Sequence, residues 1–353
     1  MDTLTHALSG ALLARATAPR EATADALPLT RRIALGFFAA AFPDIDFIAS
    51  YFSPIGYLYY HRGITHSWLM LPLWAALIGG LWAWACRDRG NWHRYAGVVA
   101  WSIGIHIVGD WITSYGTIMF APLSDARYDL STTFIVDLWF TGIIVAALMC
   151  AWVWRRTRTP AMLGLGVLAA YVAFQFALQQ RAVDFAEDYA RGHRMHAAEI
   201  KALPRPVSPF NWMVIVTEAD RYHYALVNLF RQHVREPVAA DAGFFDRLDA
   251  PYRPVQYAQW LVVNRYGSDT ADAALAREAY SQPAFEFFRW FAAYPVVFRI
   301  DRGNPETCAW FEDLRFFTPG RLEQPFRYGT CRDGEGTWKA YRLVDAAHRV
   351  PVF

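Results

Sequence analysis

The sequence predicts a mainly α-helical, polytopic membrane protein: a transmembrane bundle of about five to six helices, followed by an α+β domain outside the membrane. Three observations predict this fold class. The chain of 353 residues is 55% hydrophobic and only 19% charged, whereas about 25% of residues are charged in a soluble domain. Its apolar residues are concentrated in residues 1–180, and its arginines occur in alternate loops. We therefore expect a transmembrane domain over residues 1–180 and an extramembrane domain over residues 181–353.

Five apolar segments are long enough to cross a bilayer, which takes about 20 helical residues. They are residues 33–52, 67–86, 95–113, 134–154 and 161–180. A sixth apolar segment, residues 3–18, is shorter. Its length fits a re-entrant helix, an interfacial helix or a tilted span, and the sequence does not distinguish these.

The arginines predict the orientation of these spans, because basic residues are enriched in cytoplasmic loops. They gather in residues 19–32, 87–94 and 155–160, whereas the intervening loops contain only Arg62 and Arg127. We therefore expect a multi-pass protein of the bacterial inner membrane whose C-terminal domain is periplasmic. The formal net charge is +2 and no basic tract is present, so no nucleic-acid partner is expected. Membrane lipids are the expected partners, and the oligomeric state stays open.

The C-terminal half has the patterning of a small α+β domain. A hairpin is predicted where two alternating apolar runs flank a polar turn, in NWMVIVTEADRYHYALVNLF. The other predicted elements are helices over 181–203 and 283–293 and strands over 296–301, 313–317 and 338–344. Cys308 and Cys331 are the cysteines of this half, and a periplasmic location predicts a disulfide between them.

Ionisable side chains interrupt the apolar segments, where they are costly and usually mark function. The candidates are Asp2, His6, Asp44, Asp46, His61, His66, His106, Asp110 and Asp137. Asp44 and His106 each follow a predicted cytoplasmic arginine by twelve residues, about 18 Å along a helix. His106 and Asp110 share a helix face, as do Asp2 and His6. Several helices therefore bring imidazoles and carboxylates to one layer of the bilayer.

This combination of ligands predicts a divalent metal, with zinc first and manganese or iron as alternatives. Such a metal lowers the pKa of water and creates a hydrolytic nucleophile. Other roles stay open for several candidates. Asp44 and Asp46 could simply end a helix after Pro43, Asp137 could cap its helix, His6 could cap or pack, and His61 could lie at the interface.

The motifs DxxTHALSG, PDID, HRGITHS, HIVGDW, TSYGT and FIVDLWF occur in this order over residues 1–155. In this the chain resembles the YdjM-like or YbcI-like family of bacterial inner-membrane, metal-dependent hydrolases. The resemblance implies a metal site built from His6, Asp44, Asp46, His61, His66, His106 and Asp110. Among these we assign catalytic roles to Asp44, Asp46 and Asp110. Tyr115 and Asp137 match a subgroup pattern, which implies that they shape the mouth of the site.

Two functions from different classes follow. The first is a membrane-embedded hydrolase acting on the periplasmic side, on a lipid or a lipid-linked ester or amide. Arg62 and Arg127 could bind a phosphate of such a substrate or serve as interfacial anchors, and Asp2 could support the site from outside the ligand set. The second is a transporter or ion relay that uses the same Asp and His groups. The inner halves of the spans are almost wholly apolar, which disfavours a conducting path. A structural metal is a third alternative.

Overall fold

The computed structural model describes residues 1–20, 26–53, 55–195, 199–236, 238–239, 241–303, 306–321, 323–345 and 348–352. The chain divides into two compact units. One comprises residues 1–49 and 59–177, and the other comprises residues 50–58 and 178–353. The first unit is helical, whereas the second contains two β-sheets.

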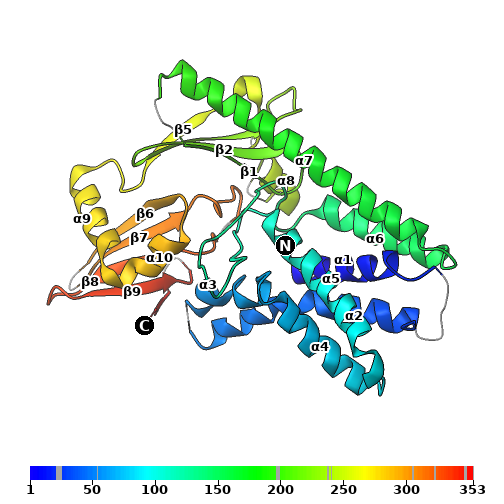
Figure 1. Cartoon of the computed structure of the whole chain (residues 1–353). Helices are drawn as coiled ribbons and strands as arrows, with labels where there is room; N and C mark the ends of the chain where they lie inside the picture. The colour runs from blue at the N-terminus through cyan, green and yellow to red at the C-terminus, as the bar shows by residue number, and fades with distance from the viewer. Residues whose placement is uncertain are drawn as a thin grey trace. The chain divides into compact units, whose positions relative to one another are not determined.

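Helices make up the first half of the chain (Figure 1), and most of them belong to the helical unit. The α-helices are α1 Thr3–Ala16, α2 Leu29–Ala41, α3 Gly56–Tyr60, α4 Leu71–Ala85, α5 Trp92–Trp111, α6 Leu138–Val153 and α7 Thr159–Gly192. Short 3₁₀ segments are η1 Phe42–Tyr51, η2 Ile64–His66 and η3 Arg89–Asn91. The 3₁₀ segments η1 and η2 and helix α5 carry the side chains of the site described below.

Helix α1 is buried on most of its surface, because two apolar clusters meet on it. One cluster joins α1 to α2, α4 and α5 through residues such as Leu35 and Ile103. The other joins Leu12 of α1 to α6 and to the first turns of α7. Helices α1 and α2 cross closely at Gly10 and Gly36, where a Cβ on Gly10 would lie 2.3 Å from the Gly36 carbonyl oxygen. A larger residue at either position would push the two helices apart.

The number of helices that can span a membrane is smaller than the sequence predicts. Among the described residues, two helical segments are long and apolar enough, Leu29–Tyr51 and Thr159–Gly192. A third candidate is the pair Gly56–His66 and Leu71–Ala85, which is bent by 79° at its break. The expectation of five to six spans is therefore not met, and two to three candidates remain.

Helices α1, α5 and α6 are not among the candidate spans, and the reason lies in their length or composition. Helices α1 and α6 have 14 and 16 residues, fewer than the roughly 20 that a 30 Å apolar slab needs. Helix α5 has 20 residues, but His93, Arg94, His106 and Asp110 lie along it and lower its apolar character. The apolar segments that we predicted over 95–113 and 134–154 are thus helical without qualifying as spans by length and composition.

The C-terminal unit contains two five-stranded sheets. The strands of the first are β1 Glu199–Pro204, β2 Asn211–Glu218, β3 Arg221–Asn228, β4 Arg253–Pro254 and β5 Trp260–Asn264. The second is an antiparallel meander of β6 Pro295–Arg302, β7 Thr307–Asp313, β8 Tyr328–Arg332, β9 Trp338–Leu343 and β10 Arg349–Pro351. The further helices of the C-terminal unit are α8 Phe244–Asp249, α9 Thr270–Ser281 and α10 Glu286–Phe291. Its short 3₁₀ segments are η4 Val255–Tyr257 and η5 Pro283–Phe285.

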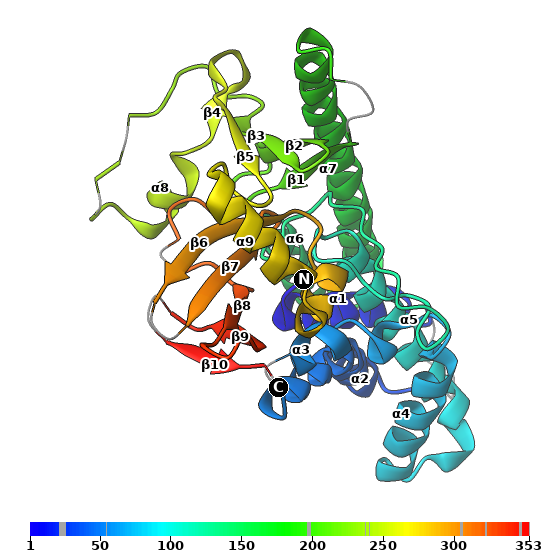
Figure 2. The same cartoon turned by 90° about the vertical axis from the view of Figure 1, so that its left-hand side faces the viewer.

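Each sheet of this unit has a helical cover. The second half of α7 packs on the first sheet through Leu178, Ala182 and Ala186 against Trp212 and Val214. Helix α9 crosses the second sheet (Figure 2). The predicted hairpin is confirmed as β2 and β3, and Cys308 and Cys331 form the predicted disulfide between β7 and β8.

Two details of this unit differ from the prediction. The helix expected over 181–203 ends at Gly192, and β1 begins at Glu199. The strand expected over 313–317 was placed too far along the chain. The observed strand β7 ends at Asp313, and a turn follows it. The apolar run after Asp313 packs in the core from this turn, so its apolarity reflects burial rather than pairing.

Candidate metal centre

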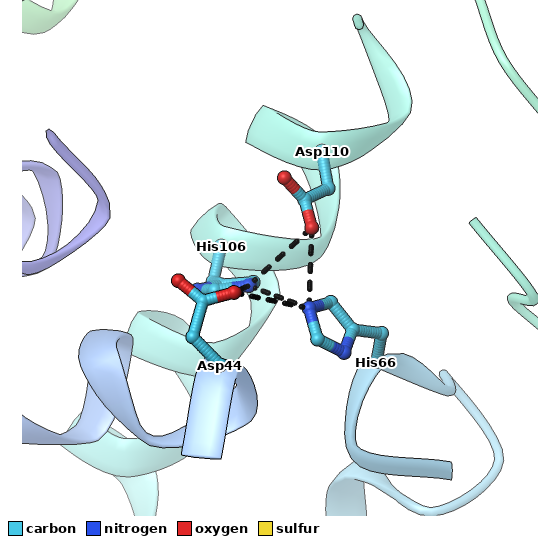
Figure 3. A group of neighbouring side chains, drawn as sticks. All are labelled: Asp44, His66, His106 and Asp110. Carbon is cyan, nitrogen blue, oxygen red and sulfur yellow. Dashed lines mark hydrogen bonds and ion pairs between the residues drawn. The ribbon is translucent and has the colours of Figure 1, made fainter. Parts of the chain in front are cut away.

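Four side chains from three separate segments converge in the helical unit. Asp44 comes from η1, His66 from η2, and His106 and Asp110 from α5. One oxygen or nitrogen atom of each lies within 4.8 Å of those of the others, and all four side chains are buried. Figure 3 shows them pointing toward a common centre.

Local sequence explains these positions. Pro43 follows the end of α2, where it lacks the N–H that would continue the helical bonding, and the chain tightens into η1. This turns Asp44 inward to a 6% exposed position. His106 and Asp110 are four residues apart on α5, so they project from one face one turn apart.

The nitrogen and oxygen atoms of the four side chains lie close together. His66 Nε2 lies 2.9 Å from His106 Nε2 and 3.1 Å from Asp110 Oδ2. His106 Nε2 is 3.6 Å from Asp110 Oδ2, and Asp44 Oδ1 is 3.7 Å from both imidazole nitrogens. The geometry thus gathers two imidazole nitrogens and two carboxylate oxygens around one point (Figure 3).

The hydrogen bonds on the far side of each imidazole assign the tautomers. His106 Nδ1 lies 2.6 Å from the Ala40 carbonyl oxygen, which can only accept, so this nitrogen carries a proton. His66 Nδ1 lies 3.3 Å from the Asp46 carboxylate and donates in the same way. If both imidazoles are neutral, each Nε2 atom then carries a lone pair and no proton. Two such nitrogens cannot form a hydrogen bond with each other. The pair is arranged for a shared cation.

Asp46 supports the centre from the outside. Its Oδ1 accepts from His61 Nδ1 at 2.7 Å, and its Oδ2 accepts from the Arg62 backbone N–H and the Thr65 hydroxyl, each at 3.0 Å. With the His66 contact, Asp46 is engaged on both oxygens. Carboxylates in this position fix the tautomer and orientation of a metal-ligating histidine.

Asp110 is the most heavily engaged acid. Its Oδ1 lies 3.0 Å from His6 Nε2 and also contacts the Met1 amino group, and its Oδ2 lies 2.9 Å from Arg62 Nε. The Arg62 side chain is 2% exposed and also donates to the Thr113 hydroxyl at 2.8 Å. His6 stacks on His106 with ring centroids 3.6 Å apart. Gly109 makes room for this stack, because a Cβ there would lie 3.1 Å from His6 Cε1.

The charges of the cluster favour a cation. The cluster and its support contain three carboxylates, those of Asp44, Asp46 and Asp110, and two cations, the Arg62 guanidinium and the Met1 amino group, both of which contact Asp110. The group is therefore net negative when its imidazoles are neutral. Asp44 Oδ2 is buried and has no hydrogen-bond partner among the described residues. A buried, unpartnered carboxylate oxygen is expensive, and a divalent cation bound by these four residues would compensate it. The donor set therefore fits zinc, and it also suits manganese or iron.

The other predicted residues lie around this group rather than in it. His6, Asp46 and His61 contact members of the group. Tyr115 lies under the Arg62 and Arg127 guanidinium groups, 4.7 and 5.4 Å from its ring centre.

Asp2 and Asp137 both act as helix N-caps. Asp2 accepts from the Thr5 backbone N–H at 3.0 Å. Asp137 accepts from the backbone N–H groups of Trp139 and Phe140, both at 2.9 Å, and from the Tyr171 hydroxyl at 2.9 Å. The capping alternative that the sequence left open for Asp137 accounts for its two backbone contacts, and the Tyr171 hydroxyl contact comes in addition.

Sequence reasoning missed three partners of the centre. Thr65 bonds both Asp46 and His66 Nδ1, each at 3.0 Å, and Thr113 receives the Arg62 hydrogen bond. Both lie inside motifs that the sequence displays, one residue before His66 and three after Asp110, so their spacing was a usable signal. The Ala40 carbonyl leaves no sequence signal, since any residue offers a backbone oxygen. A second group, Glu306 with Cys308 and Cys331, offers no thiolate because the cysteines are disulfide-bonded.

A helical unit with candidate membrane spans and a buried Asp/His cluster defines the class: a membrane protein with a candidate metal site. Residues 1–182 match the model of the YdjM inner membrane protein family, and the chain belongs to this family. The family and the apolar helices together support a location in the inner membrane. Comparisons with curated proteins and with solved structures found no match.

Proposed function

We propose that this protein is a metal-dependent hydrolase of the inner membrane, with Asp44, His66, His106 and Asp110 as the metal ligands. The observation that carries the proposal is the pair of imidazole nitrogens 2.9 Å apart, each with its proton held on the opposite side of the ring by an acceptor. Zinc is the first candidate, because two histidines with carboxylates form a common zinc ligand set. A divalent metal in such a site acidifies water and polarises a carbonyl or phosphoryl oxygen.

We assign the other roles at the site to Asp44, Asp46 and Arg62. Asp44 Oδ2 and Asp110 Oδ2 both lack a hydrogen-bond partner among the described residues, but Asp110 Oδ2 has ion-pair contacts with Arg62 and His66. Asp44 Oδ2 is therefore the oxygen placed to take a proton from an attacking water as general base. Asp46 positions His66, and its two oxygens are already occupied by donors. Arg62 holds Asp110 and keeps positive charge beside the centre.

The surroundings of Asp44 support an amphiphilic substrate. In the same 3₁₀ segment, Ile45, Phe47 and Ile48 are 41–49% exposed, whereas Asp44 is buried. Exposed apolar side chains beside a polar centre suit a molecule with an acyl chain and a hydrolysable head. We therefore propose a lipid or a lipid-linked ester or amide, reached from the periplasmic side that the arginine distribution predicts.

An ion relay is the second candidate, and one observation favours it. His61, Asp46 and His66 form a continuous polar chain, and His66 continues to Asp110 and His6. Such a chain can pass protons when a proton rather than a metal lies between His66 and His106. The two proposals differ in what occupies the centre.

Metal content separates them. Full-length protein purified in a non-ionic detergent is analysed by inductively coupled plasma mass spectrometry, beside His106→Ala and Asp110→Asn. We expect about one equivalent of metal in the wild type, as for a four-ligand site, and background levels in both variants. His93→Ala is the matched control, because His93 is an exposed histidine on the same helix α5. It should keep the wild-type content.

Hydrolysis of ester and amide lipids is then assayed in the same samples. Activity that follows the metal supports the hydrolase. A metal-free wild type that stays metal-free after incubation with zinc, manganese and iron rejects the proposal in favour of the relay. Metal retained without activity in any lipid assay, together with lower thermal stability in the ligand variants, points to a structural metal.

A further inference from the structure

A second polar site lies in the helical unit, away from the Asp/His cluster in sequence. A cavity of about 510 Å³ opens where the end of α1 meets the loop before α7. Its lining includes Arg15, Arg20, Arg156, Arg158, Met162 and Leu163. Among the lining residues that the structure describes, none is acidic and four are arginines.

Two of these arginines build the wall. Arg15 is 6% exposed and donates to the Arg155 carbonyl at 2.9 Å and to the Thr157 carbonyl. Arg158 donates to the Ala18 carbonyl at 3.0 Å. These bonds connect the end of α1 to the 155–159 loop, and because carbonyls are neutral they leave both positive charges uncompensated.

The other two arginines are available for a ligand. Arg20 and Arg156 are exposed, and neither forms a hydrogen bond or ion pair with another residue that the structure describes. The cavity also borders Thr159, the first residue of the 34-residue helix α7, where the helix dipole adds positive potential. Concentrated positive charge of this kind selects an anion.

Apolar side chains lie beside the cavity. Met162 and Leu163, in the first two turns of α7, are 48% and 65% exposed, and α7 is one of the candidate membrane spans. Trp152 and Trp154, just before the loop, are 68% and 59% exposed. Exposed tryptophans next to a span are typical of the level of lipid head groups. An anion held here would have hydrocarbon beside it rather than only water.

We infer that this cavity binds the phosphate head group of an anionic membrane phospholipid, with its acyl chains along the start of α7. A basic pocket between helices, next to the interfacial level, is the arrangement that recognises anionic lipids. The exposed Met162 and Leu163 favour a lipid over a free phosphate, since a free ion gains nothing from apolar neighbours. The site is independent of the Asp/His cluster and of the proposed hydrolysis.

Native mass spectrometry of the full-length protein in a non-ionic detergent tests this. Dioleoylphosphatidylglycerol, dioleoylphosphatidylcholine and inorganic phosphate are titrated separately. We expect phosphatidylglycerol to bind more tightly than the other two. The double variant Arg20→Gln/Arg156→Gln should weaken it by about 30-fold, since a basic residue near an anionic surface contributes ~1 kcal/mol.

The matched control is Arg87→Gln/Arg89→Gln, which removes the same charge from exposed positions in another arginine-rich loop. It should leave phosphatidylglycerol binding within twofold of the wild type. Equal binding of the two lipids, an unchanged double variant, or the same loss in the control each overturns the lipid site. Displacement of phosphatidylglycerol by an equal concentration of inorganic phosphate also overturns it, and shows a simple anion site instead.

Discussion

Asp44 in the helical unit and Asp313 in the C-terminal unit are both buried aspartates, but their surroundings differ. Asp313 Oδ1 accepts from the backbone N–H groups of Tyr294 and Arg315, and its Oδ2 accepts from Ala293 N–H and from Arg315 Nε at 2.8 Å. Asp44 Oδ2 has no hydrogen-bond partner among the described residues. One aspartate is satisfied by its own domain, and the other is left for a ligand.

The difference shows how burial of charge can serve stability or binding. A buried charge that the chain itself satisfies locks one conformation, and removing a partner leaves an uncompensated charge. A buried cluster that the chain leaves incomplete binds whatever completes it. In the helical unit the incomplete groups include Asp44 and the two facing imidazoles of His66 and His106. Three predictions test this contrast.

The largest effect is expected at Asp313. Asp313→Ala leaves Arg315 buried without its carboxylate, so we expect a loss of about 3–5 kcal/mol in the free energy of unfolding of the C-terminal unit. Thermal and chemical unfolding followed by near-UV circular dichroism measures it. Asp188→Ala, which removes the exposed Arg191–Asp188 pair, should leave this free energy unchanged within the error of the measurement, because solvent screens an exposed ion pair.

The metal content of Asp313→Ala is measured as well. Because Asp313 belongs to the C-terminal unit, folded Asp313→Ala should keep the wild-type metal content. Equal stability losses in Asp313→Ala and Asp188→Ala would show that a buried ion pair stabilises this unit no more than an exposed one.

The middle effect is expected at Asp46. Asp46→Asn removes the charge that holds the His66 and His61 protons, so metal affinity should fall by about 10–100-fold, with the fold kept. Competition with a fluorescent zinc chelator measures the affinity, and Asp125→Asn, at an exposed position, is the control. If Asp46→Asn abolished binding as fully as His106→Ala, Asp46 would be a direct ligand rather than a support.

These contrasts also show what the sequence could predict. HRGITHS and HIVGDW placed His66, His106 and Asp110 in one layer, because fixed helical spacing and the need to pair buried charges act locally along the chain. The alternation in NWMVIVTEADRYHYALVNLF predicted the hairpin, because successive side chains of a strand point to opposite faces of the sheet. Cys308 and Cys331 were predicted to pair from their number and location, and they do.

Other features depended on packing that spacing does not encode. Asp44 and Asp46 are two residues apart and equally acidic, yet the tight 3₁₀ turn directs Asp44 to the centre and Asp46 to the outer face of His66. The Ala40 carbonyl that orients His106 has no side-chain signature. The helices predicted over 67–86 and 134–154 were too long, because apolar loop residues, such as those before Leu71, extend a hydropathy pattern beyond the helix itself. The segment predicted over 161–180 was too short, since α7 continues to Gly192.

The smallest effect is expected at Asp137, where the sequence left a role at the site and a helix cap as alternatives. Asp137→Ala removes the acceptor for two backbone N–H groups of α6 and for the Tyr171 hydroxyl, so we expect about 1 kcal/mol of destabilisation. Asp137→Ser keeps a capping oxygen and should recover most of it. Melting temperatures in detergent, with metal content measured on the same samples, give both answers. Unchanged metal in both variants assigns Asp137 to the fold, because a cap acts on α6 alone. Loss of metal in Asp137→Ala, with the melting temperature unchanged, would instead connect Asp137 to the centre and extend the candidate site to the start of α6.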